Sequence, residues 1–144
     1  MRKLFVIITL LCGTLFYSNA QEVGLRFGDI SGGNVAIDGV FALGEFTRVH
    51  ADVSFGNKGV GVDALWDFLY RPLGEEAFNW YAGVGAYTFL ASDFKLGAIA
   101  ELGLEYRFKE VPLAIGADWR PYLEIIDNTN LGFDSFGLNV RWVF

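Results

Sequence analysis

The stretch LGAIAELGLEYRF, residues 96–108, decides the fold. Its even positions carry apolar or aromatic side chains, from Leu102 in the middle to Phe108 at the end. Its odd positions carry mostly glycine and charge, including Glu101 and Arg107. Successive side chains of a β-strand point to opposite faces, so this alternation predicts a strand with one apolar and one charged face.

The same alternation recurs along the chain, which indicates an all-β protein. Seven further strands are expected at residues 23–28, 34–44, 48–55, 60–70, 78–89, 113–120 and 136–144. Segment 78–89 has small or aromatic residues on both sides, so its faces stay unassigned. Turn signals lie between these segments, at residues 31–34, 56–59, 71–74 and 127–130. Eight segments of about ten residues match tilted transmembrane strands.

The first twenty residues have the pattern of a cleaved export signal. Arg2 and Lys3 precede an apolar run at residues 4–11, and small residues end the segment at Ala20. The single cysteine, Cys12, lies inside this segment, and the residue before it is not small, so a lipoprotein anchor is not expected. We therefore predict a signal peptide at residues 1–20 and one domain at residues 21–144.

Composition restricts the class of protein further. The chain is 53% hydrophobic with a mean hydropathy of +0.34, yet no run of eighteen apolar residues follows the signal segment. The net charge is −6 and becomes −8 when the two basic residues of the signal are removed, which argues against nucleic-acid binding. In lipid, only helices and closed barrels satisfy all backbone polar groups. The expected fold is an eight-stranded antiparallel up-and-down transmembrane β-barrel.

The charged face of these strands is expected to point into the barrel. It carries Arg26, Asp38, Arg48, His50, Asp52, Asp63, Asp67, Glu101, Glu105, Arg107, Asp118, Arg120 and Arg141. An eight-stranded barrel is just wide enough for side chains to fill it. The interior is therefore predicted to be a network of paired charges, closed rather than an open pore.

The aromatic residues of the opposite face are expected to form two belts at the membrane interfaces. An even number of strands places both termini on one side, the periplasm. The periplasmic belt would contain Phe46, Phe68, Tyr70, Phe78, Trp80, Tyr106, Phe108, Trp142 and Phe144. The other belt would contain Phe27, Phe55, Tyr87, Phe89 and Trp119.

Three motifs resemble those of a known family. The terminal stretch GLNVRWVF at 137–144 is similar to the C-terminal signal of outer-membrane barrels, and NWYAGVGAY at 79–87 and GADWRP at 116–121 resemble strands of small barrels of Bacteroidota type. These are OmpA/OmpX-like eight-stranded barrels of Gram-negative bacteria. The resemblance implies a place in the cell outer membrane, among its lipid and lipopolysaccharide, and recognition of Trp142 and Phe144 by the barrel assembly machinery. It implies no activity.

Catalytic and metal chemistry is weakly represented. His50, Asp52 and Ser54 share the charged face of one strand, but residues two apart lie about 6.6 Å from each other along it, too far for a direct catalytic relay. Asp118 and Arg120 could bind a polar ligand, although an interior ion pair is the favoured interpretation. One histidine and no cysteine beyond residue 20 give no metal site. We predict no catalytic residues, metal or cofactor.

The expected role is that of a monomeric, non-enzymatic membrane barrel with a structural or surface-recognition function. The longest connection, residues 122–135, is predicted to be a loop, and its acidic and apolar part at 123–128 is the expected recognition surface. Two alternatives stay open. One is an outer-membrane enzyme that modifies the acyl chains of lipid A, and the other is a soluble exported barrel that binds a small apolar ligand.

Overall fold

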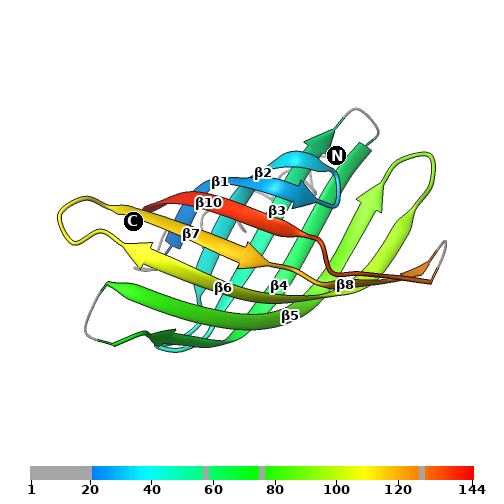
Figure 1. Ribbon diagram of the computed structural model, residues 1–144. Helices are drawn as coiled ribbons and strands as arrows, with labels where there is room; N and C mark the ends of the chain where they lie inside the picture. Colours follow the sequence, from blue (N-terminus) through cyan, green and yellow to red (C-terminus); the bar gives the residue numbers. More distant parts are fainter. Residues whose placement is uncertain (1–20, 57–58, 75–76, 127–128) are drawn as a thin grey trace, which may run out of the picture.

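The structure, a computed structural model, describes residues 21–56, 59–74, 77–126 and 129–144 (Figure 1). These residues form ten strands: β1 Gln21–Ile30, β2 Gly33–Ala42, β3 Arg48–Gly56, β4 Gly59–Pro72, β5 Phe78–Leu90, β6 Lys95–Arg107, β7 Leu113–Trp119, β8 Tyr122–Ile126, β9 Asn130–Gly132 and β10 Phe136–Val143. The predicted signal peptide, residues 1–20, lies outside the described residues. Within them, no helix is long and apolar enough to cross a membrane.

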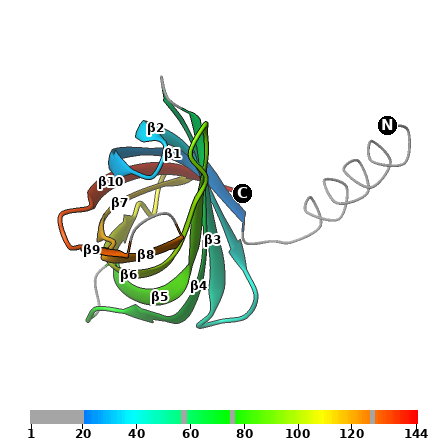
Figure 2. The ribbon, with the colours of Figure 1, turned by 90° about the vertical axis from the view of Figure 1, so that its right-hand side faces the viewer.

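The strands close into an antiparallel barrel of eight. Each strand from β1 to β6 pairs with the next one along the chain, and β10 pairs with both β7 and β1. β8 continues β7 along β6, and β9 pairs with β8, so these short strands extend two barrel strands at one end (Figure 2). At the other end the Phe144 amide donates to the Gln21 carbonyl at 2.9 Å. The predicted up-and-down, eight-stranded topology is confirmed.

The predicted assignment of the two faces is also confirmed. Of the thirteen charged residues expected inside, all except Arg107 are buried. The apolar face is turned outward, with 62% of Leu138, 53% of Ile37 and 46% of Val140 exposed. Because charge lies inside and apolar surface outside, the barrel is inverted relative to a soluble protein.

Tyr70 does not lie on its predicted face, because β4 contains a β-bulge. Asp67 pairs with Gly83 and Leu69 with Ala82, which leaves Phe68 as the extra residue. One inserted residue exchanges the faces of all residues beyond it. Tyr70 therefore points inward, where its hydroxyl donates to Glu105 Oε1 at 2.9 Å. Its predicted place in the outer aromatic belt is wrong.

Two further residues of the predicted aromatic belts, Tyr87 and Phe89, lie on the interior side of β5, so their predicted place is also wrong. The inward positions of β5 are the odd ones, and Tyr81 and Tyr87 are both buried. Tyr87 and Phe89 line a cavity inside the barrel. The sequence did not distinguish the faces of this strand because glycine, alanine and aromatic residues occupy both.

The predicted loop at residues 122–135 is largely two strands. Pro121 interrupts the seventh barrel strand, but its carbonyl still accepts a hydrogen bond from the Ala100 amide, and β8 resumes the pairing with β6. Glu124, expected on a recognition loop, is 6% exposed. Residues 127–128 lie outside the described residues. The interpretation of 123–128 as a surface loop is therefore wrong for its strand part.

The turn between β1 and β2 bends into the end of the barrel that is far from the termini. The Gly32 amide donates to Ser54 Oγ at 2.9 Å, and Ser31 Oγ donates to Asp63 Oδ1 at 2.7 Å. A Cβ atom at Gly32 would lie 2.5 Å from the Gly61 nitrogen, so this close approach requires glycine. The turn covers part of the barrel mouth.

Candidate functional site in the barrel interior

The buried charged side chains other than Glu124 form one connected group, here called the interior charge network. Its members are Glu22, Arg26, Asp38, Arg48, His50, Asp52, Asp63, Asp67, Glu101, Glu105, Asp118, Arg120 and Arg141. Strand alternation aims them inward from seven of the eight barrel strands, except for Arg120, which directly follows the end of β7. Each arginine contacts at least one carboxylate, as buried charges require.

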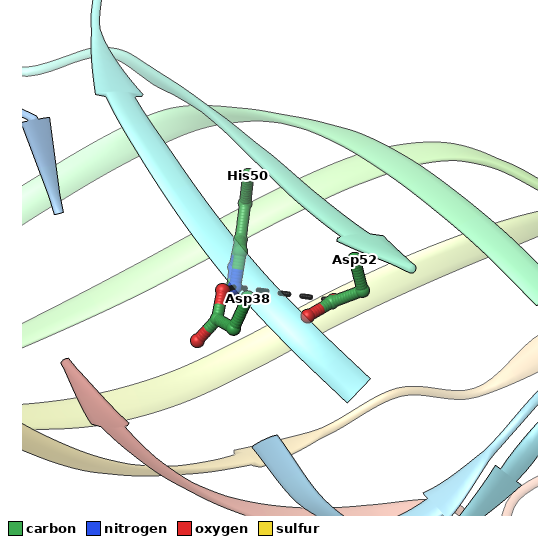
Figure 3. Close-up of side chains that lie close together, drawn as sticks. All are labelled: Asp38, His50 and Asp52. Atoms are coloured by element: carbon green, nitrogen blue, oxygen red, sulfur yellow. Dashed lines mark hydrogen bonds and ion pairs between the residues drawn. The ribbon is translucent and has the colours of Figure 1, made fainter. Parts of the chain in front are cut away.

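His50 lies among three carboxylates of the network, two of which, Asp38 and Asp52, are shown with it in Figure 3. Its Nε2 is 2.6 Å from Asp38 Oδ1 and its Nδ1 is 3.0 Å from Glu101 Oε2. Asp52 Oδ2 is 4.0 Å from Nε2. Each ring nitrogen thus faces a carboxylate, and Arg120 Nη2 also lies 3.3 Å from Nδ1 and 3.2 Å from Nε2.

Two arginines share the carboxylates around His50. Arg120 donates from Nε to Glu101 Oε1 at 2.9 Å and also contacts Asp52. Arg141 donates from Nη1 to Asp38 Oδ2 at 3.2 Å. His50 and the two arginines thus lie among the same three acids, and the arginines offset the cost of burying those carboxylates.

Two sets of side chains in the network could supply metal ligands, which sequence reasoning did not identify. They are Asp38 with His50 and Asp52, and His50 with Asp67 and Glu101. The guanidinium groups of Arg120 and Arg141 already bring positive charge to these carboxylates. The donor set therefore fits an ion-pair network better than a metal centre.

His50 and Ser54, which the sequence places on one face, have separate partners. Both lie on the interior side of β3, as expected. Ser54 Oγ accepts from the Gly32 amide and donates to the Gly61 carbonyl at 3.4 Å. The nitrogens of His50 face Asp38 and Glu101 instead. Ser54 therefore holds the β1–β2 turn and His50 belongs to an ion-pair centre, so the two residues are not arranged as a nucleophile beside its base.

Asp118 and Arg120 are both buried, but the closer partner of Asp118 is another arginine. The Arg120 Nε to Asp118 Oδ1 distance is 3.5 Å. Arg26 Nη2 lies 2.5 Å from the same oxygen, and Asn139 Nδ2 donates to Oδ2 at 3.0 Å. The predicted ion pair between Asp118 and Arg120 is therefore part of a larger cluster, in which Arg26 and Asn139 lie closer to Asp118 than Arg120 does. Arg26 was not predicted as a partner because it is far from Asp118 in the sequence.

The end of the interior near the termini is filled by aromatic rings and charge. The Arg48 guanidinium lies 4.5 Å from the ring centre of Tyr70 and 4.3 Å from that of Tyr81. Glu105 accepts from Arg48 at 3.0 Å and from Arg141 at 2.5 Å. Glu22, absent from the predicted set, contacts Arg107 and lies 2.9 Å from Arg141 Nε. The sequence could have identified Glu22, because strand alternation places it on the same inward face as Arg26.

The opposite end contains a cavity of about 710 Å³, here called the mouth cavity. It is lined by Asp29, Ile30, Ser31, Gly32, Gly33, Asn34, Phe55, Gly56, Asp63, Tyr87, Phe89, Lys95, Ile99, Tyr122, Glu124 and Ser135. Leu65, Tyr87 and Ile99 pack together with Tyr122 as an apolar layer. Lys95 Nζ lies 3.2 Å from Glu124 Oε2. No sequence pattern predicted this cavity.

Comparison with known proteins adds no assignment. No protein-family model matches the sequence, and no match was found among curated proteins.

Proposed function

We propose that this chain is an integral outer-membrane β-barrel with a structural or surface-recognition role. The observation that carries the proposal is the inversion of the barrel, with a continuous apolar exterior around an interior of paired charge. A soluble protein with so many exposed Leu, Val, Ile and Phe side chains would associate or aggregate. In a bilayer the same surface would contact lipid, and each of the eight barrel strands is paired on both edges within the part of the chain that the structure describes.

Aromatic residues near both ends of the barrel support this orientation. Near the termini, Tyr106 packs edge-on against Phe78 at 4.8 Å and Phe108 at 5.0 Å between ring centres. Toward the other end, Trp119 stacks with Phe136 at 6.5 Å. Amphipathic rings favour the two membrane interfaces. We place the termini in the periplasm and the mouth cavity at the outer face.

The interior supports a barrel that does not conduct ions. Arg26, Arg120 and Arg141 are fully buried, and each is held by carboxylates from other strands. An ion that crossed the barrel would have to separate several of these pairs at once. We therefore propose a closed barrel with no catalytic role.

The proposed partners follow from the outer surface. Membrane lipid and lipopolysaccharide would contact the apolar exterior. The barrel assembly machinery would read the C-terminal strand, where Trp142 and Phe144 are 49% and 69% exposed. The proposed state is a monomer in the outer membrane of a Gram-negative bacterium of Bacteroidota type.

The test is cell fractionation of the expressed full chain, followed by gel mobility with and without heating and by conductance in planar bilayers. The proposal expects the protein in the outer-membrane fraction, a shift of mobility on heating, and no stable channels. Recovery in the soluble periplasmic fraction would favour the soluble ligand-binding alternative. A changed lipid A acyl pattern in expressing cells, measured by mass spectrometry, would favour the enzyme.

A further inference from the structure

We propose that the mouth cavity binds a small organic cation with an apolar or aromatic body, and that Asp63 and Glu124 receive its positive charge. The inference rests on the shape, lining and charge of the cavity. It is independent of whether lipid or water surrounds the barrel.

The cavity has the size and walls of a small-molecule site. Its volume of about 710 Å³ falls within the range of about 300–1,000 Å³ that is usual for ligand pockets. Its apolar walls are Ile30, Phe55, Tyr87, Phe89, Ile99 and Tyr122. The rings of Tyr87 and Tyr122 are 5.7 Å apart at 78°, so they pack edge to face. Aromatic faces of this kind attract organic cations.

The charged residues of the cavity lining favour a ligand with a positive charge. The lining residues that the structure describes include three carboxylates, Asp29, Asp63 and Glu124, and one cation, Lys95. Lys95 already contacts both oxygens of Glu124, at 3.2 Å each. Three carboxylates against one ammonium group give the lining a formal net charge of −2. The nearest further cation, Arg120, lies 3.5 Å from Asp63 and is shared with Asp52 and Glu101.

Two of the carboxylates are held in place before a ligand arrives. Asp63 is 2% exposed, and its Oδ1 accepts from Ser31 at 2.7 Å, while Arg120 lies 3.5 Å from Oδ2. Glu124 is fixed by Lys95 and lies 3.5 Å from the Tyr87 hydroxyl. They come from β4 and β8, and both line the same cavity as the aromatic walls. Fixed charges in a partly desolvated site interact more strongly than charges in water.

The chemistry disfavours the other ligand classes. An anion would meet two immobilised carboxylates and a lysine that is already paired. A neutral apolar ligand would fill the walls but would leave the negative field uncompensated. A primary amine on an aromatic body would satisfy both the walls and the charge.

Three probes with the same indole body separate these classes: tryptamine as the cation, indole-3-ethanol as the neutral form and indole-3-propionate as the anion. Each is titrated by calorimetry into the purified protein and into the matching buffer alone. The same titrations are made with Asp63→Asn, Glu124→Gln and the control Glu45→Gln. Glu45 is exposed in the β2–β3 turn at the opposite end of the barrel, so its substitution removes an equal charge far from the cavity. Gel mobility with and without heating shows which variants are folded.

Tryptamine is expected to bind more tightly than the other two probes. Each cavity substitution should weaken its binding roughly tenfold, which corresponds to about 1.4 kcal/mol, and Glu45→Gln should leave it unchanged. If Asp63→Asn does not fold, Glu124→Gln carries the test. The proposal is overturned if indole-3-propionate binds as tightly as tryptamine. It is also overturned if the folded cavity variants bind tryptamine normally, or if no probe binds.

Discussion

Arg26 and Asp118 are 92 residues apart in the sequence, yet Arg26 Nη2 lies 2.5 Å from Asp118 Oδ1. Arg26 belongs to β1 and Asp118 to β7, and both strands flank β10. The ion pair therefore crosses the last strand on its interior side, over Gly137. It fastens the region where the first and last strands close the barrel.

Removing one partner of this pair should cost more than the pair itself contributes. Arg26→Met leaves Asp118 partly uncompensated, and the expected loss is about 3–5 kcal/mol of unfolding free energy. The double variant Arg26→Met/Asp118→Leu should lose less than the sum of the two single variants, by about 0.5–3 kcal/mol. Urea unfolding followed by tryptophan fluorescence measures each value. Lys109→Met, at an exposed turn, is the matched control, and strictly additive costs would contradict the coupling.

Gly137 should not tolerate a side chain. An added Cβ would lie 2.5 Å from the Nε of Arg26, so Gly137→Ala has to displace the guanidinium from Asp118. We expect a loss of about 1–3 kcal/mol, the usual cost of overpacking. Gly39→Ala is the control, because a Cβ there points outward and its nearest neighbour is the Phe41 ring at 3.4 Å, an ordinary contact distance. Equal stability of the two alanine variants would refute the steric argument.

The two tyrosines near the termini should differ because of the β4 bulge. Tyr70→Phe removes an inward hydroxyl that donates to Glu105 and should cost about 1 kcal/mol. Tyr106 lies on the outer face among Phe78 and Phe108, so Tyr106→Phe should change stability by less than about 0.5 kcal/mol. The same urea titration compares them. A larger loss of stability from Tyr106→Phe than from Tyr70→Phe would contradict the inward orientation of Tyr70.

Charge on the exterior should be costly only at membrane depth. Val140 pairs with Leu25 and Ile115 in the middle of the outward apolar surface, whereas Leu131 belongs to the short strand β9 at one end. Val140→Arg should cost about 2–4 kcal/mol in lipid vesicles, and Leu131→Arg about 0–1 kcal/mol. Folding titrations in vesicles measure both. Similar costs for the two arginines would count against insertion in the proposed orientation.

Residue alternation predicted most of the fold because a strand's faces follow directly from the order of its side chains. Segment 96–108 becomes β6 with the expected faces, and the charges of the other strands become the interior charge network. The alternation pattern predicts the wrong face where a bulge adds one residue to a strand. The bulge at Phe68 turns Tyr70 inward, and it depends on pairing with β5 that the local sequence does not encode.

The candidate site was predicted only in part, for a related reason. That His50 and Arg120 lie inside followed from the pattern, but their meeting through Glu101 depends on the stagger between strands far apart in sequence. The mouth cavity needs the inward turn at Gly32 and the strand β8 beyond Pro121. A proline after an apolar strand normally indicates a loop, and here pairing with β6 overrides that preference.

The contacts of Arg141 have a consequence for the order of folding. This residue, three from the end of the chain, reaches Glu22 on β1, Asp38 on β2 and Glu105 on β6. None of these three carboxylates receives that guanidinium until β10 has paired with β1. A chain with seven strands in place would therefore hold surplus negative charge inside an open sheet. Closure and the pairing of these carboxylates with Arg141 are then a single late event, and we expect the barrel to form cooperatively and slowly, as contacts of such long range dictate.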